Sequence, residues 1–316
     1  RLAPYCRAIN KNKVFQASMF VALLCALFFP DIWILADRSN NDDLDVVLTL
    51  VLVMFLFELA VQSIGLTRTY LGSFFFWMDL LGAVSLLLDL SYLGIMSGGG
   101  DSVSSNVVIM RAARIAKLGA RAGRFTRLVK LLRFLPGMRE QGTDAGTAKV
   151  ISGRLITALS TRVSCLIIIM VMIMPLFSMW TYPEEDKSMS SWLFVLEKTI
   201  ARTPDKLGEK LTMFESFYTD MNYYPYSLRA KPGSGVRLAN GSAALLPWSS
   251  SRGPPNRRTN SVRHDSADLE CDFNFTHPYQ IDSLMNILLL LVVMVLMVGF
   301  SLVLSNSVSA IVLRPL

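Results

Sequence analysis

Six stretches of the chain are long and apolar enough to cross a lipid bilayer as helices. One crossing takes about 20 residues, because a helix of that length matches about 30 Å of hydrocarbon. The composition fits, since 52% of the residues are hydrophobic and only 17% are charged, whereas soluble domains average about 25% charged. We therefore expect an all-α membrane protein with spans at Val14–Leu35, Asp45–Ile64, Phe74–Leu93, Asn106–Leu135, Leu155–Trp180 and Ile281–Leu304.

Basic residues indicate which loops face the cytoplasm, because Lys and Arg gather in the short cytoplasmic loops of membrane proteins. One basic group precedes the first span and another follows the fourth, whereas the loop 37–45 is acidic. Six spans then place both ends of the chain in the cytoplasm and residues 181–280 outside. The two basic groups are Arg1, Arg7, Lys11 and Lys13, and Arg139, Lys149, Arg154 and Arg162.

The outer segment 181–280 is polar and long enough for a small extracellular domain. Its first part favours a small helical or α+β cap, and residues 231–264, rich in Gly, Pro, Ser and Arg, predict a flexible loop. Asn240 and Asn274 match the acceptor pattern for N-glycosylation. Cys271 is expected to be a free thiol, or else to form a disulfide with a partner chain. The expected divisions are 1–135, 136–180 with the fifth span, 181–280, and 281–316 with the sixth span and a cytoplasmic exit helix.

The fourth span carries a row of basic residues, called here the basic ladder, with mostly apolar or small residues between them. Each step is three residues except the four-residue step from Lys117 to Arg121. A cation at the bilayer centre costs about 2.5–3.5 kcal/mol, so the ladder indicates a function that needs charge inside the membrane. Moving three charges through about 100 mV would supply about 7 kcal/mol, enough to switch a two-state equilibrium almost completely. The ladder consists of Arg111, Arg114, Lys117, Arg121, Arg124, Arg127, Lys130 and Arg133.

Cations inside a membrane need acidic partners, and the second and third spans offer two. Glu58 lies about two turns before the cytoplasmic end of the second span, and Asp79 lies a similar distance after the start of the third. Because the two spans run in opposite directions, both carboxylates fall at one depth, with Phe55 one turn farther out. Acids inside apolar spans are rare and usually paired. A second, outer tier comprises Asp31, Asp45 and Asp89, which could instead be interfacial acids or helix caps.

With these residues the chain resembles the voltage-sensor domain of the voltage-gated ion channel superfamily. The matching features are the basic ladder, the aromatic-x-x-Glu pattern of Phe55 and Glu58, and Asp79. In that family the corresponding residues are the gating charges, the hydrophobic plug and the acidic charge-transfer site. The resemblance covers about residues 14–135, and it implies a four-helix voltage-sensor bundle, followed here by two further spans.

The sixth span continues without a helix-breaking residue through 305–313 to Arg314-Pro315-Leu316. This ending resembles the exit helix of protist membrane proteins that join an ion-transport-type domain to a class III adenylate or guanylate cyclase. The resemblance implies the membrane region of a voltage-sensing nucleotide cyclase in the plasma or ciliary membrane. It also implies a homodimer, because such cyclases form their active sites between two catalytic domains. We expect no cofactor in these residues, and Mg²⁺ or Mn²⁺ with ATP or GTP in a catalytic domain beyond Leu316.

Three other interpretations stay open. The ladder could be a basic helix on the membrane surface that binds anionic lipid. The chain could be a cation-channel subunit with a divergent pore, although a selectivity filter needs a short re-entrant loop at membrane depth, and about a hundred polar residues separate Trp180 from Ile281. Finally, the outer segment could bind a ligand while the ladder has lost its function.

Overall fold

A computed structural model describes residues 3–65, 70, 72, 74–90, 167, 170, 177, 186–231 and 246–313. The chain divides into two compact units. The first contains residues 1–33, 41–179 and 285–316, and the second contains residues 34–40 and 180–284. The basic ladder lies outside the described residues, as does the predicted fifth span apart from its three isolated positions.

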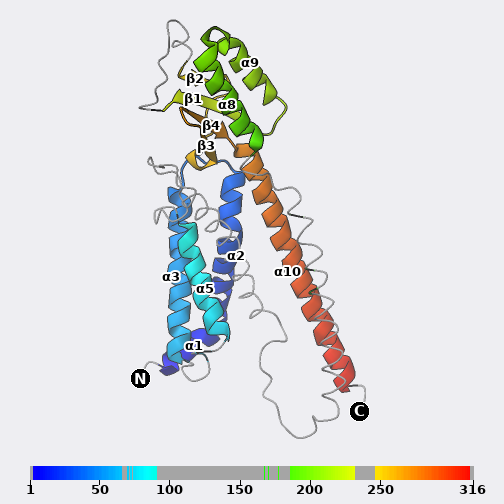
Figure 1. Ribbon diagram of the computed structural model, residues 1–316. Helices are drawn as coiled ribbons and strands as arrows, with labels where there is room; N and C mark the ends of the chain where they lie inside the picture. Colours follow the sequence, from blue (N-terminus) through cyan, green and yellow to red (C-terminus); the bar gives the residue numbers. More distant parts are fainter. Residues whose placement is uncertain are drawn as a thin grey trace. The chain divides into compact units, whose positions relative to one another are not determined.

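The first unit is helical (Figure 1). Its described elements are α1 (Ala3–Lys11), α2 (Lys13–Leu35), α3 (Asp42–Gly65), α5 (Phe74–Asp89) and the larger part of α10 (Thr276–Leu313). Within the described residues, three helical segments are long and apolar enough to cross a membrane: Lys13–Leu35, Asp42–Gly65 and Thr276–Val303. The prediction of a membrane protein is supported at this level, whereas the four-helix bundle and the count of six spans remain predictions.

Helix α3 shows why these helices suit a membrane. Its buried residues recur every three or four positions and include Leu48, Phe55 and Val61, which gives one inward stripe. Its outward side is apolar as well, because Leu50, Val53 and Phe57 are each at least half exposed. A helix that is apolar all round needs either a protein core or lipid around it. The exposed apolar side of α3 therefore fits contact with lipid.

One buried cluster joins α2, α3, α5 and α10. Leu23 and Leu27 of α2, Leu48 of α3, Leu86 of α5 and Leu290 of α10 all belong to it. At the C-terminal end of α3, the Nε atom of Arg7 in α1 donates a hydrogen bond to the carbonyl oxygen of Gly65 at 2.8 Å. This contact satisfies one of the carbonyl groups that a helix end leaves without an intrahelical partner.

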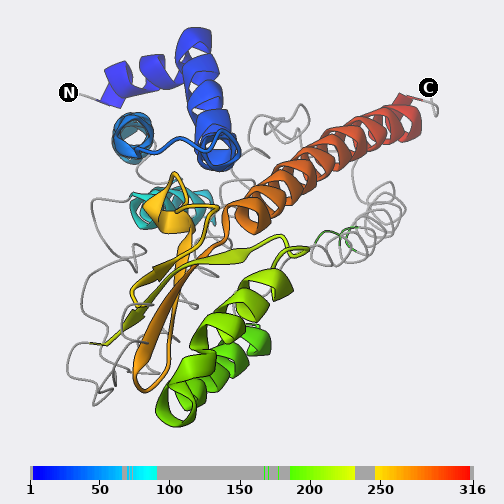
Figure 2. The same ribbon diagram turned by 90° about the horizontal axis from the view of Figure 1, so that it is seen from above.

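The second unit contains an antiparallel sheet, so the chain is not all-α there. Of the two forms expected for the outer segment, the α+β form is the one observed. The strands β1 (Tyr224–Ala230), β2 (Trp248–Ser249), β3 (Ser261–Asp265) and β4 (Leu269–Asn274) lie in the order β2-β1-β4-β3. Two helices, α8 (Lys187–Arg202) and α9 (Leu207–Phe217), lie beside the sheet (Figure 2), and short 3₁₀ turns occur at η3 (Pro204–Lys206) and η5 (Arg258–Asn260). We call residues 186–231 and 246–275 the sheet domain.

Side-chain alternation on β4 explains the two faces of this sheet. Leu269, Cys271 and Phe273 are fully buried and share a core with Phe214 and Tyr218. The polar residues between them point to the opposite face, as a strand's period of two requires. A disulfide from Cys271 to a partner chain is therefore excluded in the folded domain, and burial raises the pKa of this thiol well above its usual value.

The flexible loop predicted for residues 231–264 is wrong in its second half. Within 246–264 the chain forms β2, η5 and most of β3. The prediction rested on the Gly, Pro, Ser and Arg content, but Trp248 and Val262 pack against the domain core. Apolar side chains that pack on the core thus help to order a segment of polar composition.

Candidate functional site

The two acids predicted to face the ladder are both buried within packed helices. Glu58 in α3 is 2% exposed and Asp79 in α5 is 4% exposed. Helices α3 and α5 pack against each other and are antiparallel (Figure 1). Glu58 precedes the end of α3 at Gly65, and Asp79 follows the start of α5 at Phe74. Both carboxylates therefore lie within about two turns of the same end of the helix pair.

Each acid accepts a hydrogen bond from a polar side chain that the sequence reasoning missed. The Nε2 atom of Gln62 donates to Oε1 of Glu58 at 2.9 Å, and the hydroxyl of Tyr70 donates to Oδ2 of Asp79 at 2.5 Å. Gln62 could have been found, because it lies one turn after Glu58 in an otherwise apolar stretch. Tyr70 lies between α3 and α5 in the sequence, where no periodic pattern of apolar residues marks it.

Phe55 lies one turn before Glu58 on α3 and is 1% exposed. It belongs to the buried cluster that joins α2, α3, α5 and α10. The apolar packing around Phe55 and the carboxylates about one turn farther along create a sharp change in polarity along α3. A buried carboxylate is costly unless a cation or hydrogen-bond donors compensate it. The arrangement suits a site that stabilises a cationic side chain at one depth in the bundle.

The outer tier of acids is mixed. Asp31 is 1% exposed within α2, which fits an intramembrane acid. Asp45 is half-buried and lies in the first turn of α3 beside Asp42 and Asp43. Acids there interact favourably with the helix dipole, so the cap interpretation suits Asp45. The side chain of Asp89 lies outside the described residues.

One of the two predicted glycosylation sites, Asn274, lies in the described part of the chain and is buried. Asn240 lies outside the described residues. Asn274 is 6% exposed, its Nδ2 donates to the hydroxyl of Tyr224 at 3.0 Å, and its Oδ1 accepts from the backbone N–H of Thr276 at 2.9 Å. Both ends of this amide are used and buried, which argues against a glycan on Asn274 in the folded domain.

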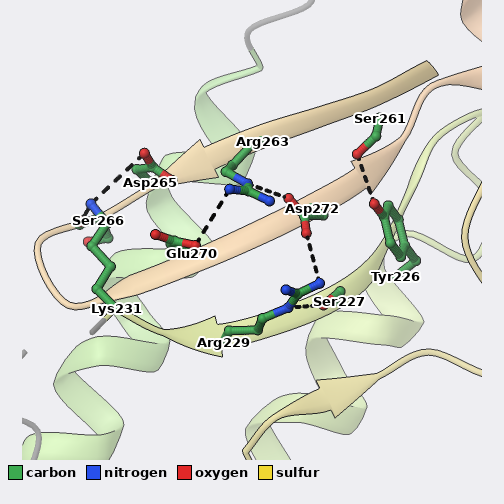
Figure 3. Close-up of polar contacts among 10 residues, drawn as sticks. All are labelled: Tyr226, Ser227, Arg229, Lys231, Ser261, Arg263, Asp265, Ser266, Glu270 and Asp272. Carbon is green, nitrogen blue, oxygen red and sulfur yellow. Dashed lines mark hydrogen bonds and ion pairs between the residues drawn. The ribbon is translucent and has the colours of Figure 1, made fainter. Parts of the chain in front are cut away.

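The polar face of the sheet carries a charged cluster (Figure 3). Asp272 of β4 lies between two arginines, with Oδ1 2.8 Å from Nε of Arg263 and Oδ2 3.6 Å from a terminal nitrogen of Arg229. Arg263 also lies 3.8 Å from Glu270, and Nζ of Lys231 donates to the carbonyl of Ser266 at 2.7 Å. Charges of both signs compensate each other here, which favours a structural role.

Comparisons of the chain with protein-family models, with curated proteins and with solved structures found no match.

Proposed function

We propose that this chain is the membrane region of a voltage-sensing nucleotide cyclase. The observation that carries the proposal is the pair of buried acids, Glu58 and Asp79, in a bundle of apolar helices, with Phe55 buried one turn before Glu58. In a chain that also carries the basic ladder, such acids are suitable stations for cations that move through the membrane field.

Voltage would act through the ladder. Depolarisation moves the ladder outward, so that successive cations pass Phe55 and exchange places beside Glu58 and Asp79. Each charge that crosses the field gains about 2.3 kcal/mol per 100 mV. About three charges are sufficient to switch the sensor between two states.

Helix α10 is suited to carry this movement onward. Leu290 and Val293 of α10 belong to the same buried cluster as residues of α2, α3 and α5, so a rearranged sensor changes the packing around α10. The helix has 38 residues, about 57 Å at 1.5 Å per residue. This length exceeds the roughly 30 Å of hydrocarbon, so one rigid element extends past the membrane boundary.

The proposed output is a class III cyclase domain beyond Leu316 that works as a homodimer with Mg²⁺ or Mn²⁺ and with ATP or GTP. The lipid bilayer and that catalytic domain are the partners of this region, and the plasma or ciliary membrane is its proposed location, with both ends cytoplasmic. A voltage-gated cation channel subunit is the alternative. It has less support, because the described residues 186–231 and 246–275, between the predicted last two spans, fold into the sheet domain.

The direct test is cyclic-nucleotide production by the full-length protein in cells under voltage clamp. The proposal predicts that production changes with membrane potential, and that Arg121→Gln with Arg124→Gln shifts the potential of half-maximal output. Production that is the same at all potentials would refute the coupling. An ionic current from the purified protein in bilayers would favour the channel.

A further inference from the structure

The loop between α2 and α3 is part of the second unit, although both flanking helices belong mainly to the first. Residues 34–40 cluster with residues 180–284. The centre of the contact is Asp37, whose Oδ2 accepts a hydrogen bond from Nδ2 of Asn256 at 2.7 Å and whose Oδ1 lies 3.5 Å from Nδ2 of Asn260. These partners are 219 and 223 residues away in the sequence.

A buried cation strengthens this contact. Arg257 lies between the two asparagines in the sequence and is only 5% exposed. Burial lowers the pKa of its guanidinium, and the negative charge of Asp37 opposes that change. The carboxylate of Asp37 also makes its hydrogen bonds with the two asparagine amides stronger than bonds between neutral groups. Asp37 is thus the acidic centre of an attachment between the α2–α3 loop and the sheet domain.

The backbone of Asp37 is adapted to this position. Its φ angle is 45°, in the left-handed region that Asp and Asn occupy more readily than other residues with a side chain. The backbone N–H of Asp37 donates to the carbonyl of Ile34 at 3.1 Å. The loop therefore turns sharply at the residue that makes the long-range contacts.

The same contacts reach the beginning of α10. Nδ2 of Asn260 lies 3.5 Å from the hydroxyl oxygen of Thr276, the first residue of α10. The backbone N–H of Phe275 donates to the carbonyl of Asn260 at 2.8 Å. Farther along α10, Nε2 of Gln280 donates to the carbonyl of Leu35, the last residue of α2, at 3.3 Å. Two routes thus connect the end of α2 with the start of α10.

We propose that these contacts form a tether that couples α2 to α10 outside the span. The tether consists of Leu35 and Asp37 on one side, and of Asn256, Arg257, Asn260 and Gln280 on the other. It holds the first turns of α10 at the end of α2, so that sensor motion displaces the remainder of α10 against a fixed end. This role rests on the proposed function, because it takes α10 as the output helix.

The test uses two glycine variants of the same loop in the full-length protein. Asp37→Gly removes both acceptor oxygens, and glycine accepts a positive φ without strain. Arg38→Gly is the matched control, because Arg38 is exposed and its replacement adds the same backbone freedom to the loop. Hydrogen exchange in lipid nanodiscs reports on the tether, and cyclic-nucleotide output with displacement current under voltage clamp reports on coupling.

Exchange in peptides covering 256–276 should be about tenfold faster in Asp37→Gly, with peptides from α9 unchanged, and should stay within about twofold of the parent protein in Arg38→Gly. Equal exchange in the two variants would overturn the tether. Asp37→Gly should also retain its displacement current but lose at least half of the voltage-dependent output. Unchanged output in a variant with faster exchange would overturn the coupling role. If the parent protein shows no voltage-dependent output, the proposed function fails, and exchange still decides whether the tether exists.

Discussion

Asp272 shows how single residues hold the sheet domain together. Its side chain is 7% exposed, while those of Arg263 and Arg229 are 50% and 57% exposed. The carboxylate is therefore the desolvated member of the cluster, and the arginines cover it from the two neighbouring strands (Figure 3). Arg263, Asp272 and Arg229 lie on strands β3, β4 and β1, so the cluster spans the centre of the sheet.

Replacing Asp272 by Ala should lower the free energy of unfolding of the sheet domain by about 1–3 kcal/mol. This loss is smaller than that expected for breaking a fully buried ion pair, because both arginines are half exposed and water screens their charges. Glu270→Ala is the control. It removes only the longer 3.8 Å contact to Arg263 and should cost less than about 1 kcal/mol. Denaturant titration of tryptophan fluorescence measures both, and equal losses would contradict a special role for Asp272.

We predict that His264 makes the sheet domain sensitive to acid. Burial lowers the pKa of its imidazole below 6.5, although Asp265 and Asp186 act in the opposite direction. The folded domain therefore favours the neutral ring, whereas the unfolded chain takes up a proton near pH 6.5. The stabilising contribution is complete above about pH 6.5 and decreases as the pH falls towards the folded pKa.

The sheet domain should accordingly unfold at a lower temperature at pH 5 than at pH 7.5, and His264→Gln should reduce this difference. His277→Gln is the matched control, because it removes the chain's other histidine. Thermal unfolding followed by tryptophan fluorescence provides the measurement. A pH difference that survives in His264→Gln would assign the effect to other groups.

Among the helices, α10 is the longest described one, and in the proposed mechanism it carries the signal out of the membrane. It runs from Thr276 to Leu313 without interruption. Leu302 is 53% exposed and lies beyond the buried cluster that contains Leu290 and Val293. It is therefore a position where the continuity of the helix can be changed without disturbing that buried cluster.

Leu302→Pro should abolish most of the voltage-dependent output while leaving the displacement current in place. Proline removes a backbone hydrogen bond and costs about 3 kcal/mol or more in a helix interior. Leu302→Ala retains the helix and should retain the output. Parallel recordings of current and cyclic-nucleotide production test this. Normal output from the proline variant would show that the signal does not travel along α10 as a rigid element.

The sequence predicted the apolar helices well and the sheet poorly, for physical reasons. Twenty apolar residues give a strong signal, so α2 and α3 begin and end within three residues of the predicted spans. Strands of two to seven residues give a weak one. In β1, Pro225 obscures the pattern further, because proline disfavours interior strand positions, and the register shifts next to it.

The candidate site was predictable to a similar, uneven extent. Phe55, Glu58 and Asp79 were recognisable because charges and spacing stand out in apolar stretches, and all three are buried. The contact of Asp37 with Asn256 had no local signal, because only folding brings together residues 219 positions apart.

In the proposed mechanism, positive charge on the basic ladder crosses the membrane field beside the buried acids Glu58 and Asp79. Glu58→Gln removes one negative charge without changing the shape of the side chain. If the substitution destabilises one sensor state by about 1.4 kcal/mol and three charges move, the potential at the midpoint of charge movement shifts by about 20 mV. Asp43→Asn is the control, because Asp43 is an exposed acid in the first turn of α3. It should shift the midpoint potential of charge movement far less.

Displacement current in voltage-clamped cells that express the full-length protein is the most direct measurement. The account predicts a transient charge movement that saturates at both extremes of potential, with a midpoint that shifts by about 20 mV or more in Glu58→Gln. Only a linear capacitive current, equal to that of cells without the protein, would contradict the claim that the basic ladder moves through the field.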